Sequence, residues 1–333
     1  MLSSGVPAAT LWGPKLTSFL SSAGTRVANL ECCLVPEGTP PTRSQKAFKF
    51  LSEETHGISA LLAVKINAVS IANNHVGDAD EGFVTTPRAL DSVGIAHAGA
   101  GPDAAAAWAP ARFTAEDGTR ISLFSFADFG NSQDGEWAAA PLPLGRPGLA
   151  AKELGDEALS WLCKAAKTER ASGQQIVMCA VHWGANYVPQ VPHQHIVFGR
   201  GAIAIGGVDV VVGTSSHHPL AIEFVSKTSD IDPSRQGVVL YGLGDALDDY
   251  ALDASFRNDL GIAATVKFDV ARGTVLSVEA LPLKLEFCKT DAAKPASAHE
   301  LTTRLTAACA PFGTYVLGPR ADGTLKIGRV PVV

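Results

Sequence analysis

The feature that most constrains the fold is a short apolar run that breaks abruptly into polar side chains. The run covers residues 67–72, and four polar residues follow it, Asn73, Asn74, His75 and Asp78. β-Branched residues among small neighbours are typical of a buried strand in a parallel sheet, and ligands bind just beyond the carboxyl ends of such strands. The run therefore predicts a strand with chemistry at its end. An Asx-rich turn that caps a helix starting near Glu81 explains the same residues, so this stretch alone leaves both interpretations open.

The same pattern recurs along the chain. Residues 26–30, 175–181 and 208–213 also have the composition of strands, and polar residues follow each one: Glu31, His182, and the pair His217 and His218. Because the ends of parallel strands meet at one edge of a sheet, we expect these side chains to share one edge. Oxygen and imidazole ligands suit Mn²⁺, Fe or Zn²⁺ rather than Ca²⁺. The sequence thus predicts a divalent-metal centre, against the alternative of four unrelated caps.

The rest of the chain alternates helical and strand patterns, with β character dominant from about residue 220. Helices are expected within 1–24 and over 81–93, 104–108, 151–171, 193–205 and 298–309, with helical packing also around Phe48, Leu51 and 58–64. Strands are expected over 26–30, 67–72, 94–101, 111–115, 120–126, 175–181, 208–213, 220–225, 237–243, 261–268, 274–283 and 325–330. Loops are expected over 35–44, 128–148 and 226–235, and the length of 128–148 makes it a candidate cover for the site.

Composition excludes several classes of partner. The chain has 333 residues, 46% of them hydrophobic, which is ample for a sizeable core. Its formal net charge is −6 and it has no run of lysine or arginine, so we expect neither nucleic acid nor membrane as a partner. Residues 1–7 lack the basic and apolar regions of a signal peptide, and no apolar stretch is long enough to span a bilayer. These features predict a soluble, cytoplasmic protein, and they leave its oligomeric state open.

Five motifs in order along the chain carry a family resemblance. They are Asn29-Leu30-Glu31, Ala72-Asn73-Asn74-His75 with Asp78, His182-Trp183-Gly184, the stretch from Gly213 to His218-Pro219, and Tyr241-Gly242-Leu243-Gly244-Asp245. Over about residues 10–330 the chain resembles the capsule synthesis protein CapA family of poly-γ-glutamate biosynthesis, which belongs to the calcineurin-like metallophosphoesterase superfamily. The resemblance implies an α/β fold of the metallophosphoesterase type, a four-layer αββα sandwich, formed here by residues 1–333 as a single domain.

The resemblance also implies roles for individual residues. Glu31 takes the place of the bridging carboxylate, Asn74 and His182 ligate the metal, and His75 is the proton donor, with Asp78 as its catalytic companion. His217 is a further ligand, with His218 beside it as the alternative.

Two other residues are candidates for substrate binding. Asp245 ends the last motif, where a carboxylate could bind an amino group, although an acidic turn after a strand explains it equally well. His195 lies at the start of a predicted helix, after Pro192, where histidines are usually just solvated.

Two departures from the family pattern concern metal ligands. The family opens with a strand that ends in Gly-Asp, and this chain begins too late to contain that motif. Thr214 stands where close relatives have a histidine. We therefore expect one metal ion rather than two, held by Glu31, Asn74, His182 and either His217 or His218.

Two functional hypotheses follow. The first is a metal-dependent enzyme, a hydrolase or amide-bond enzyme, that acts on a small or peptide-like anionic substrate. Its substrate would be an amide, a peptide with glutamate-like or other amino acids, or a phosphoester. The metal would activate water or a carbonyl, and His75 would serve as general acid. The second is a degenerate, non-catalytic homologue that binds an anionic ligand or a partner.

Overall fold

The structure is a computed structural model that describes residues 6–42, 46–128, 138–140, 145–228, 235–248 and 252–331. The chain forms two compact units and passes between them several times. Unit 1 comprises Met1–Trp12, Gly24–Glu153 and Ala180–His182, and unit 2 comprises Gly13–Ala23, Leu154–Cys179 and Trp183–Val333. Both units contain helices and strands, which confirms the α/β class. The predicted β-rich part beyond residue 220 lies entirely in unit 2.

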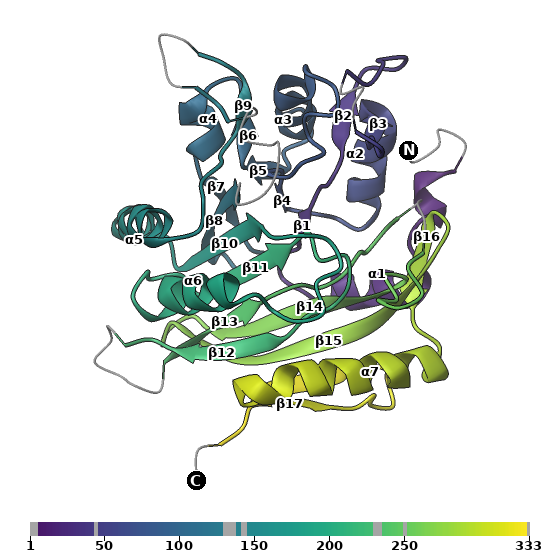
Figure 1. The fold of residues 1–333 in the computed structure, drawn as a ribbon, viewed down its shortest axis with the longest axis vertical. Coiled ribbons are helices and arrows are strands. Elements are labelled where there is room, and N and C mark those ends of the chain that lie inside the picture. Colours follow the sequence, from purple (N-terminus) through teal and green to yellow (C-terminus); the bar gives the residue numbers. More distant parts are fainter. Residues whose placement is uncertain are drawn as a thin grey trace. The chain divides into compact units, whose positions relative to one another are not determined.

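Unit 1 is built on a small parallel sheet. Its strands β1 (Val27–Asn29), β4 (Ala68–Ser70) and β5 (Ala96–Ala98) lie in the order β1-β4-β5, and both pairs are parallel. Helices α2 (Glu54–Ala63) and α3 (Gly82–Asp91) connect them along the chain (Figure 1). The predicted β-α-β start and the parallel strand before Asn73 are therefore confirmed.

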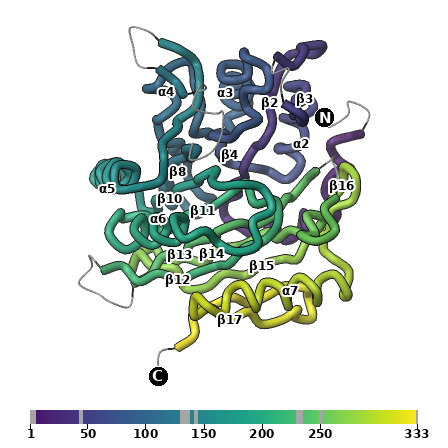
Figure 2. Tube along the Cα trace, in the orientation of Figure 1, coloured from purple at the N-terminus to yellow at the C-terminus, as the bar shows by residue number. Residues whose placement is uncertain are grey.

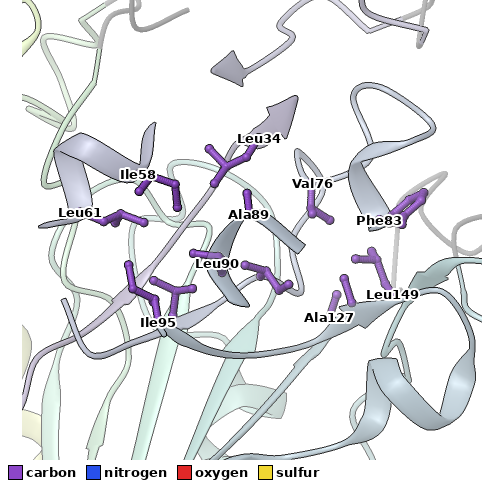
Figure 3. Packing of buried hydrophobic residues seen from close by; sticks show 13 residues of the cluster. Leu34, Ile58, Leu61, Val76, Phe83, Ala89, Leu90, Ile95, Ala127 and Leu149 are labelled. Carbon is purple, nitrogen blue, oxygen red and sulfur yellow. The ribbon is translucent and has the colours of Figure 1, made fainter. Parts of the chain in front are cut away.

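The core of unit 1 buries the apolar residues of β4 and of the position just after it. Val69 and Ile71 are fully buried in a cluster with side chains from both helices. Ile58 and Leu61 of α2 lie beside Leu90 of α3 in this cluster (Figure 3). Burying one such side chain contributes roughly 1.5–3 kcal/mol. The strand is thus held firmly up to the point where its polar residues begin.

Unit 1 also contains an antiparallel hairpin, which includes its longest strand, β8. Strands β7 (Ala111–Thr114) and β8 (Arg120–Ala127) pair antiparallel, and the Asp117-Gly118 pair between them is typical of a hairpin turn. Gly118 has a φ of 86°, a conformation that costs glycine little. The Asp117 carboxylate accepts a hydrogen bond of 2.9 Å from the backbone N–H of Thr119, which closes the turn. Unit 1 also contains α4 (Ala104–Trp108) and the two-residue strands β6 (Ala100–Gly101) and β9 (Gly148–Leu149), which pair antiparallel.

The prediction of helical packing around Leu51 was wrong. Leu51 begins strand β3 (Leu51–Glu53), which pairs in parallel with β2 (Cys33–Val35). Cys33, Val35, Leu51 and Ala79 form a small separate core that favours extended chain over another helical turn. Cys33 is buried in this core with a free thiol, and it packs there as a small hydrophobe.

Unit 2 contains two sheets. In the first sheet, the strands lie in the order β12 (Ile222–Ser226), β13 (Gln236–Leu240), β11 (Val210–Thr214) and β10 (Ile176–His182). The last three residues of β10 belong to unit 1. In the second, the order is β14 (Leu260–Asp269), β15 (Thr274–Glu286), β18 (Leu325–Arg329), β17 (Thr314–Leu317), and β16 (Lys289–Ala292) pairs with β15.

Helices cover both sheets of unit 2. Helix α6 (His193–Ala204) contacts β11, β12 and β13, and α5 (Asp156–Ala171) lies against α6. Strand β13 contacts β15, so the two sheets face each other, and α7 (Pro295–Cys309) lies along β15 and β17 (Figure 2). Helix α1 (Pro14–Ser21) contacts β15 and β16. Within unit 2 these contacts give the layer order helix, sheet, sheet, helix that the resemblance implies.

Three further expectations have different outcomes. The strand ends were expected along one sheet, but β1 and β4 belong to the three-stranded sheet while β10 and β11 belong to another. Most of the predicted loop 128–148, and residues 229–234 of the loop 226–235, lie outside the described residues. In the described part of the chain, no helix has both the length and the apolar character needed to cross a membrane.

Candidate active site

Asn73 shapes the polar turn that follows β4. Its side-chain oxygen accepts hydrogen bonds of 3.1 Å from the backbone N–H groups of both His75 and Val76, which is an Asx turn. Its amide nitrogen donates to the Leu30 carbonyl at 2.8 Å and to the Asn29 side chain at 3.3 Å. Asn73 therefore ties the end of β4 to the end of β1. The interpretation of this stretch as an Asx turn holds for Asn73, and the residues after it remain available for chemistry.

His75 and Asp78 form a buried pair directly after this turn. The Nδ1 atom of His75 lies 2.7 Å from Oδ2 of Asp78. The side chain of Asp78 is 0% exposed, and it has two further donors: the backbone N–H of Phe50 at 2.6 Å and Nζ of Lys46 at 2.9 Å. Burial alone would raise the pKa of Asp78, but the hydrogen bond and charge of His75, with Lys46 and Phe50, hold that pKa below its usual value.

An ionised Asp78 fixes the orientation of the His75 ring. A carboxylate beside Nδ1 favours the tautomer in which Nδ1 carries a proton. Among the described residues, no hydrogen bond engages Nε2 of His75. The geometry thus leaves Nε2 as the nitrogen that can exchange a proton with a ligand.

Lys46 and Phe50 complete this arrangement, and sequence reasoning missed them. The ring of Phe50 stacks on the imidazole of His75 with 4.0 Å between centroids and 29° between planes. Lys46 donates to the backbone carbonyl of Asn74 as well as to Asp78. The only signal in the sequence was a lysine and a phenylalanine in a segment after a Pro- and Gly-rich loop, which does not point to a site.

Glu31 and His182 come together at a second position in unit 1. Glu31 lies two residues beyond β1 and His182 is the last residue of β10. Nδ1 of His182 lies 3.9 Å from Oε2 of Glu31, which also accepts a 2.8 Å hydrogen bond from the Asn29 side chain. The backbone N–H of Asp128 donates to the His182 carbonyl at 2.9 Å and holds the strand end in place. Asn29, Asn73 and Glu31 are thus joined by hydrogen bonds between the ends of β1 and β4.

His217 and His218 have different partners within unit 2. Nδ1 of His217 lies 3.0 Å from the carboxylate of Asp245. Nε2–H of His218 donates to the Val188 carbonyl at 2.8 Å, so metal ligation by His218 would have to use Nδ1. Thr214 is the last residue of β11, and its carbonyl accepts the Trp183 N–H at 3.4 Å.

His195 lies in the first turn of α6 and is 1% exposed. Its ring stacks on Trp183 with 4.5 Å between centroids and 13° between planes. Neither ring nitrogen has a hydrogen-bond partner among the described residues, and burial lowers the pKa of His195 to about 4. The ring is therefore neutral at physiological pH and packs like an aromatic residue. The substrate-binding roles of His195 and Asp245 stay predictions.

Comparison with known proteins decides the family. The family model of the bacterial capsule synthesis protein PGA_cap matches residues 4–250. The chain belongs to the PGA_cap family. Two similar proteins come from Mycobacterium tuberculosis strains CDC 1551 and H37Rv, and each is named a probable polyglutamine synthesis accessory protein. Each is 28% identical to this chain over 328 residues, which cover 95% of this chain and 80% of the relative.

The metal site that the PGA_cap resemblance implies can be tested against the side chains of unit 1. The described residues contain no group of three or more His, Cys, Asp or Glu side chains placed to hold one ion. Glu31 and His182 supply one carboxylate and one imidazole. The side-chain oxygen of Asn74 is buried and has no hydrogen-bond partner among the described residues, which is costly unless another group binds it. Carboxylate and amide oxygens and an imidazole nitrogen are ligand types that suit Mn²⁺, Fe or Zn²⁺.

Proposed function

We propose that this chain is a metal-dependent enzyme that acts on an amide, peptide or phosphoester bond, with His75 as general acid. The buried pair of His75 with Asp78 carries the proposal. A histidine whose Nδ1 is held by an ionised carboxylate, with Nε2 unengaged among the described residues, has the arrangement of an acid–base catalyst.

The proposed proton transfer uses groups of this chain alone. Nε2–H of His75 donates its proton to the leaving nitrogen or oxygen as the scissile bond breaks. Water supplies the hydroxyl group that the other fragment retains, and the remaining proton of that water returns to Nε2 of His75. Asp78 stays ionised and stabilises the charged ring before the transfer. Such general acid catalysis typically contributes ~10²–10⁴-fold to the rate.

Glu31, Asn74 and His182 are the residues of unit 1 that would hold a divalent ion, one ion in our proposal. When bound, the ion would polarise the electrophile and lower the pKa of a bound water. The unpartnered oxygen of Asn74 and the proximity of Glu31 to His182 support this assignment. The role of His217 of unit 2 as a ligand stays a prediction from the family motif.

The names of the family and of the relatives support a proposal for the substrate class. Capsule synthesis in the family name, and polyglutamine synthesis in the names of the relatives, favour a peptide-like substrate. A glutamate-like, anionic character is what the CapA resemblance implies. An amide bond is then the favoured target, and a phosphoester is the alternative that the metallophosphoesterase resemblance supplies.

A second candidate is a non-catalytic homologue that binds an anionic ligand or a partner protein. The relatives are named accessory proteins, a description that fits a supporting role as well as a catalytic one.

One experiment separates the two candidates. The protein is purified without chelator, its metal content is measured, and turnover of γ-glutamyl-p-nitroanilide and bis(p-nitrophenyl) phosphate is assayed for wild type, His75→Ala and Asn74→Ala. We expect Asn74→Ala to lose metal, and His75→Ala to keep metal while kcat falls by ~10²–10⁴-fold. Absence of metal and of turnover in the wild type would favour the binding protein. Equal metal loss in both variants would make His75 a ligand instead.

A further inference from the structure

Two residues, Lys46 and Phe50, contact the His75–Asp78 pair from outside the motif that contains it. Lys46 and Phe50 lie between the end of β2 and the start of β3, about thirty residues before the histidine in the chain. Their contacts reach both members of the pair, and all of them lie within unit 1. The proposed function assigns these residues no role.

Phe50 contacts the pair in two independent ways. Its ring covers one face of the His75 imidazole at 4.0 Å, and its backbone N–H donates to Oδ2 of Asp78 at 2.6 Å. The oxygen that receives Nδ1 of His75 is therefore also held by Phe50. A ring that is stacked on one face and hydrogen-bonded at Nδ1 cannot turn about its Cβ–Cγ bond without losing both contacts.

Lys46 fixes the other half of the carboxylate. Its Nζ lies 2.9 Å from Oδ1 of Asp78 and also donates to the backbone carbonyl of Asn74. His75 and Phe50 thus donate to Oδ2 of Asp78 and Lys46 donates to Oδ1, and this arrangement fixes the plane of the carboxylate. The contact with Asn74 additionally holds the backbone of the residue that precedes His75.

The position of this segment is itself fixed by backbone pairing. The backbone N–H of Cys33 donates to the Phe50 carbonyl at 2.8 Å, and the next residue, Leu51, begins β3 against β2. Phe50 is therefore anchored by the same strand pair that forms the small core with Ala79. A segment held this firmly can restrict the motion of the ring on which it stacks.

We propose that Lys46 and Phe50 are positioning residues that fix the ring of His75 and so direct its Nε2 to the reacting bond. This inference rests on the proposed function for its catalytic consequence, while the clamp on the ring can be measured without any substrate. Placement errors of about 1 Å at a reacting group can cost ~10²-fold in rate, so loss of either residue is expected to reduce turnover strongly.

The chain offers matched controls close to both residues. Lys46→Met is compared with Lys49→Met, because the described residues contain no ion-pair partner for Lys49. Phe50→Leu is compared with Phe48→Leu, because Phe48 is 56% exposed. Lys46→Arg keeps the positive charge and tests for rescue.

The first measurement observes the ring directly by nitrogen-15 NMR of histidine-labelled protein at one fixed pH, with His75→Gln to assign the signal. In the wild type we expect a protonated Nδ1 whose proton exchanges slowly with water. Lys46→Met and Phe50→Leu should speed that exchange by at least about 10-fold, whereas Lys46→Arg and the two control variants should not. Unchanged exchange in both test variants would overturn the proposal, even if either variant were less stable.

The second measurement is turnover of γ-glutamyl-p-nitroanilide and bis(p-nitrophenyl) phosphate. We expect kcat to fall by about 10- to 100-fold in Lys46→Met and Phe50→Leu, with KM and metal content unchanged and with most of the activity restored in Lys46→Arg. If the wild type turns over neither probe, the proposed activity fails while the NMR result still decides whether the ring is clamped. If the wild type is active and both test variants keep full kcat, the positioning role is wrong and the proposed function stands.

Discussion

Replacing Asp78 with asparagine should destabilise the protein more than its small change in shape suggests. The carboxylate accepts from three donors, the His75 ring, the Phe50 N–H and the Lys46 ammonium. The amide of Asp78→Asn keeps only one oxygen. If its NH₂ group replaces Oδ1 it faces the ammonium, and if it replaces Oδ2 it faces two N–H donors. Either orientation leaves at least one donor unsatisfied inside unit 1.

The size of the effect follows from burial. One buried donor without a partner costs ~1–3 kcal/mol. The mutation also removes the ion pair with Lys46. Loss of an exposed ion pair costs ~0.2–1 kcal/mol, and breaking a buried one costs ~3–5 kcal/mol. This pair lies between the two limits, because the side chain of Asp78 is 0% exposed and that of Lys46 is 21% exposed. We therefore expect a loss of about 2–4 kcal/mol in the free energy of unfolding for Asp78→Asn.

Urea denaturation at neutral pH measures this loss, with Asp80→Asn as the control because Asp80 is exposed and two residues away. In a double-mutant cycle with Lys46→Met, the coupling energy should be about 1–2 kcal/mol. A loss for Asp78→Asn no larger than for Asp80→Asn, or additive single effects in the cycle, would show that the three donors do not depend on this charge.

The pH dependence of the same variant provides a second check. The folded-state pKa of Asp78 is held below its ordinary value of 3.8, so its ionisation stabilises the fold above that value. This contribution is lost as the pH falls through the lower, folded-state pKa. The difference in stability between wild type and Asp78→Asn should therefore be constant near neutral pH and shrink only below about pH 4.

Three further predictions concern other parts of the molecule. His182→Ala should lower metal content with little loss of stability, because His182 ends its strand; wild-type metal occupancy by elemental analysis would contradict its role as a ligand. Asp209→Asn should cost about 3–5 kcal/mol in urea denaturation, because it leaves the Lys227 ammonium, only 5% exposed, without its buried carboxylate; a loss below 1 kcal/mol would contradict this. For His195, burial lowers the pKa from 6.5 to about 4, so the fold loses stability as the pH falls between these values; His195→Gln should reduce that loss, and an identical pH profile would show that the ring protonates freely.

Much of the fold could be predicted because its signals are local. The buried strand before Asn73 has a run of apolar residues that is needed to fill space on both faces of a sheet. The Asp117-Gly118 pair indicates the hairpin of β7 and β8, because glycine suits a turn position with positive φ. In each case the residues that determine the structure lie within a few positions of one another.

The strands that were missed depend on distant partners. β2 and β3 have three residues each and are separated by fifteen residues, so neither has enough length to show a period of two. β16 and β17 have four residues each, and each is extended because a longer neighbour, β15 or β18, forms hydrogen bonds with it. Such short strands form because they pair with a neighbouring strand, and the pattern of residues within the strand itself does not reveal that neighbour.

The residues of the candidate site show the same contrast between local signals and long-range pairing. Asn74, His75 and Asp78 were found because a strand end collects polar residues that are adjacent in the chain. Lys46 and Phe50 were missed because their relevance arises only when β3 pairs with β2 and brings the preceding segment against Asp78.

The pairing of β2 with β3 explains both why sequence reasoning missed Lys46 and Phe50 and how these residues can orient His75. A histidine in a loop is oriented only as well as its neighbours restrict it, and the Asx turn of Asn73 fixes the His75 backbone but not its ring. The ring is fixed by Asp78 on one edge and Phe50 on one face, and Phe50 is in turn fixed by the sheet. The orientation of the proposed acid therefore depends on a long-range strand pair, and a change in β2 or β3 should alter turnover even though neither strand supplies a catalytic group.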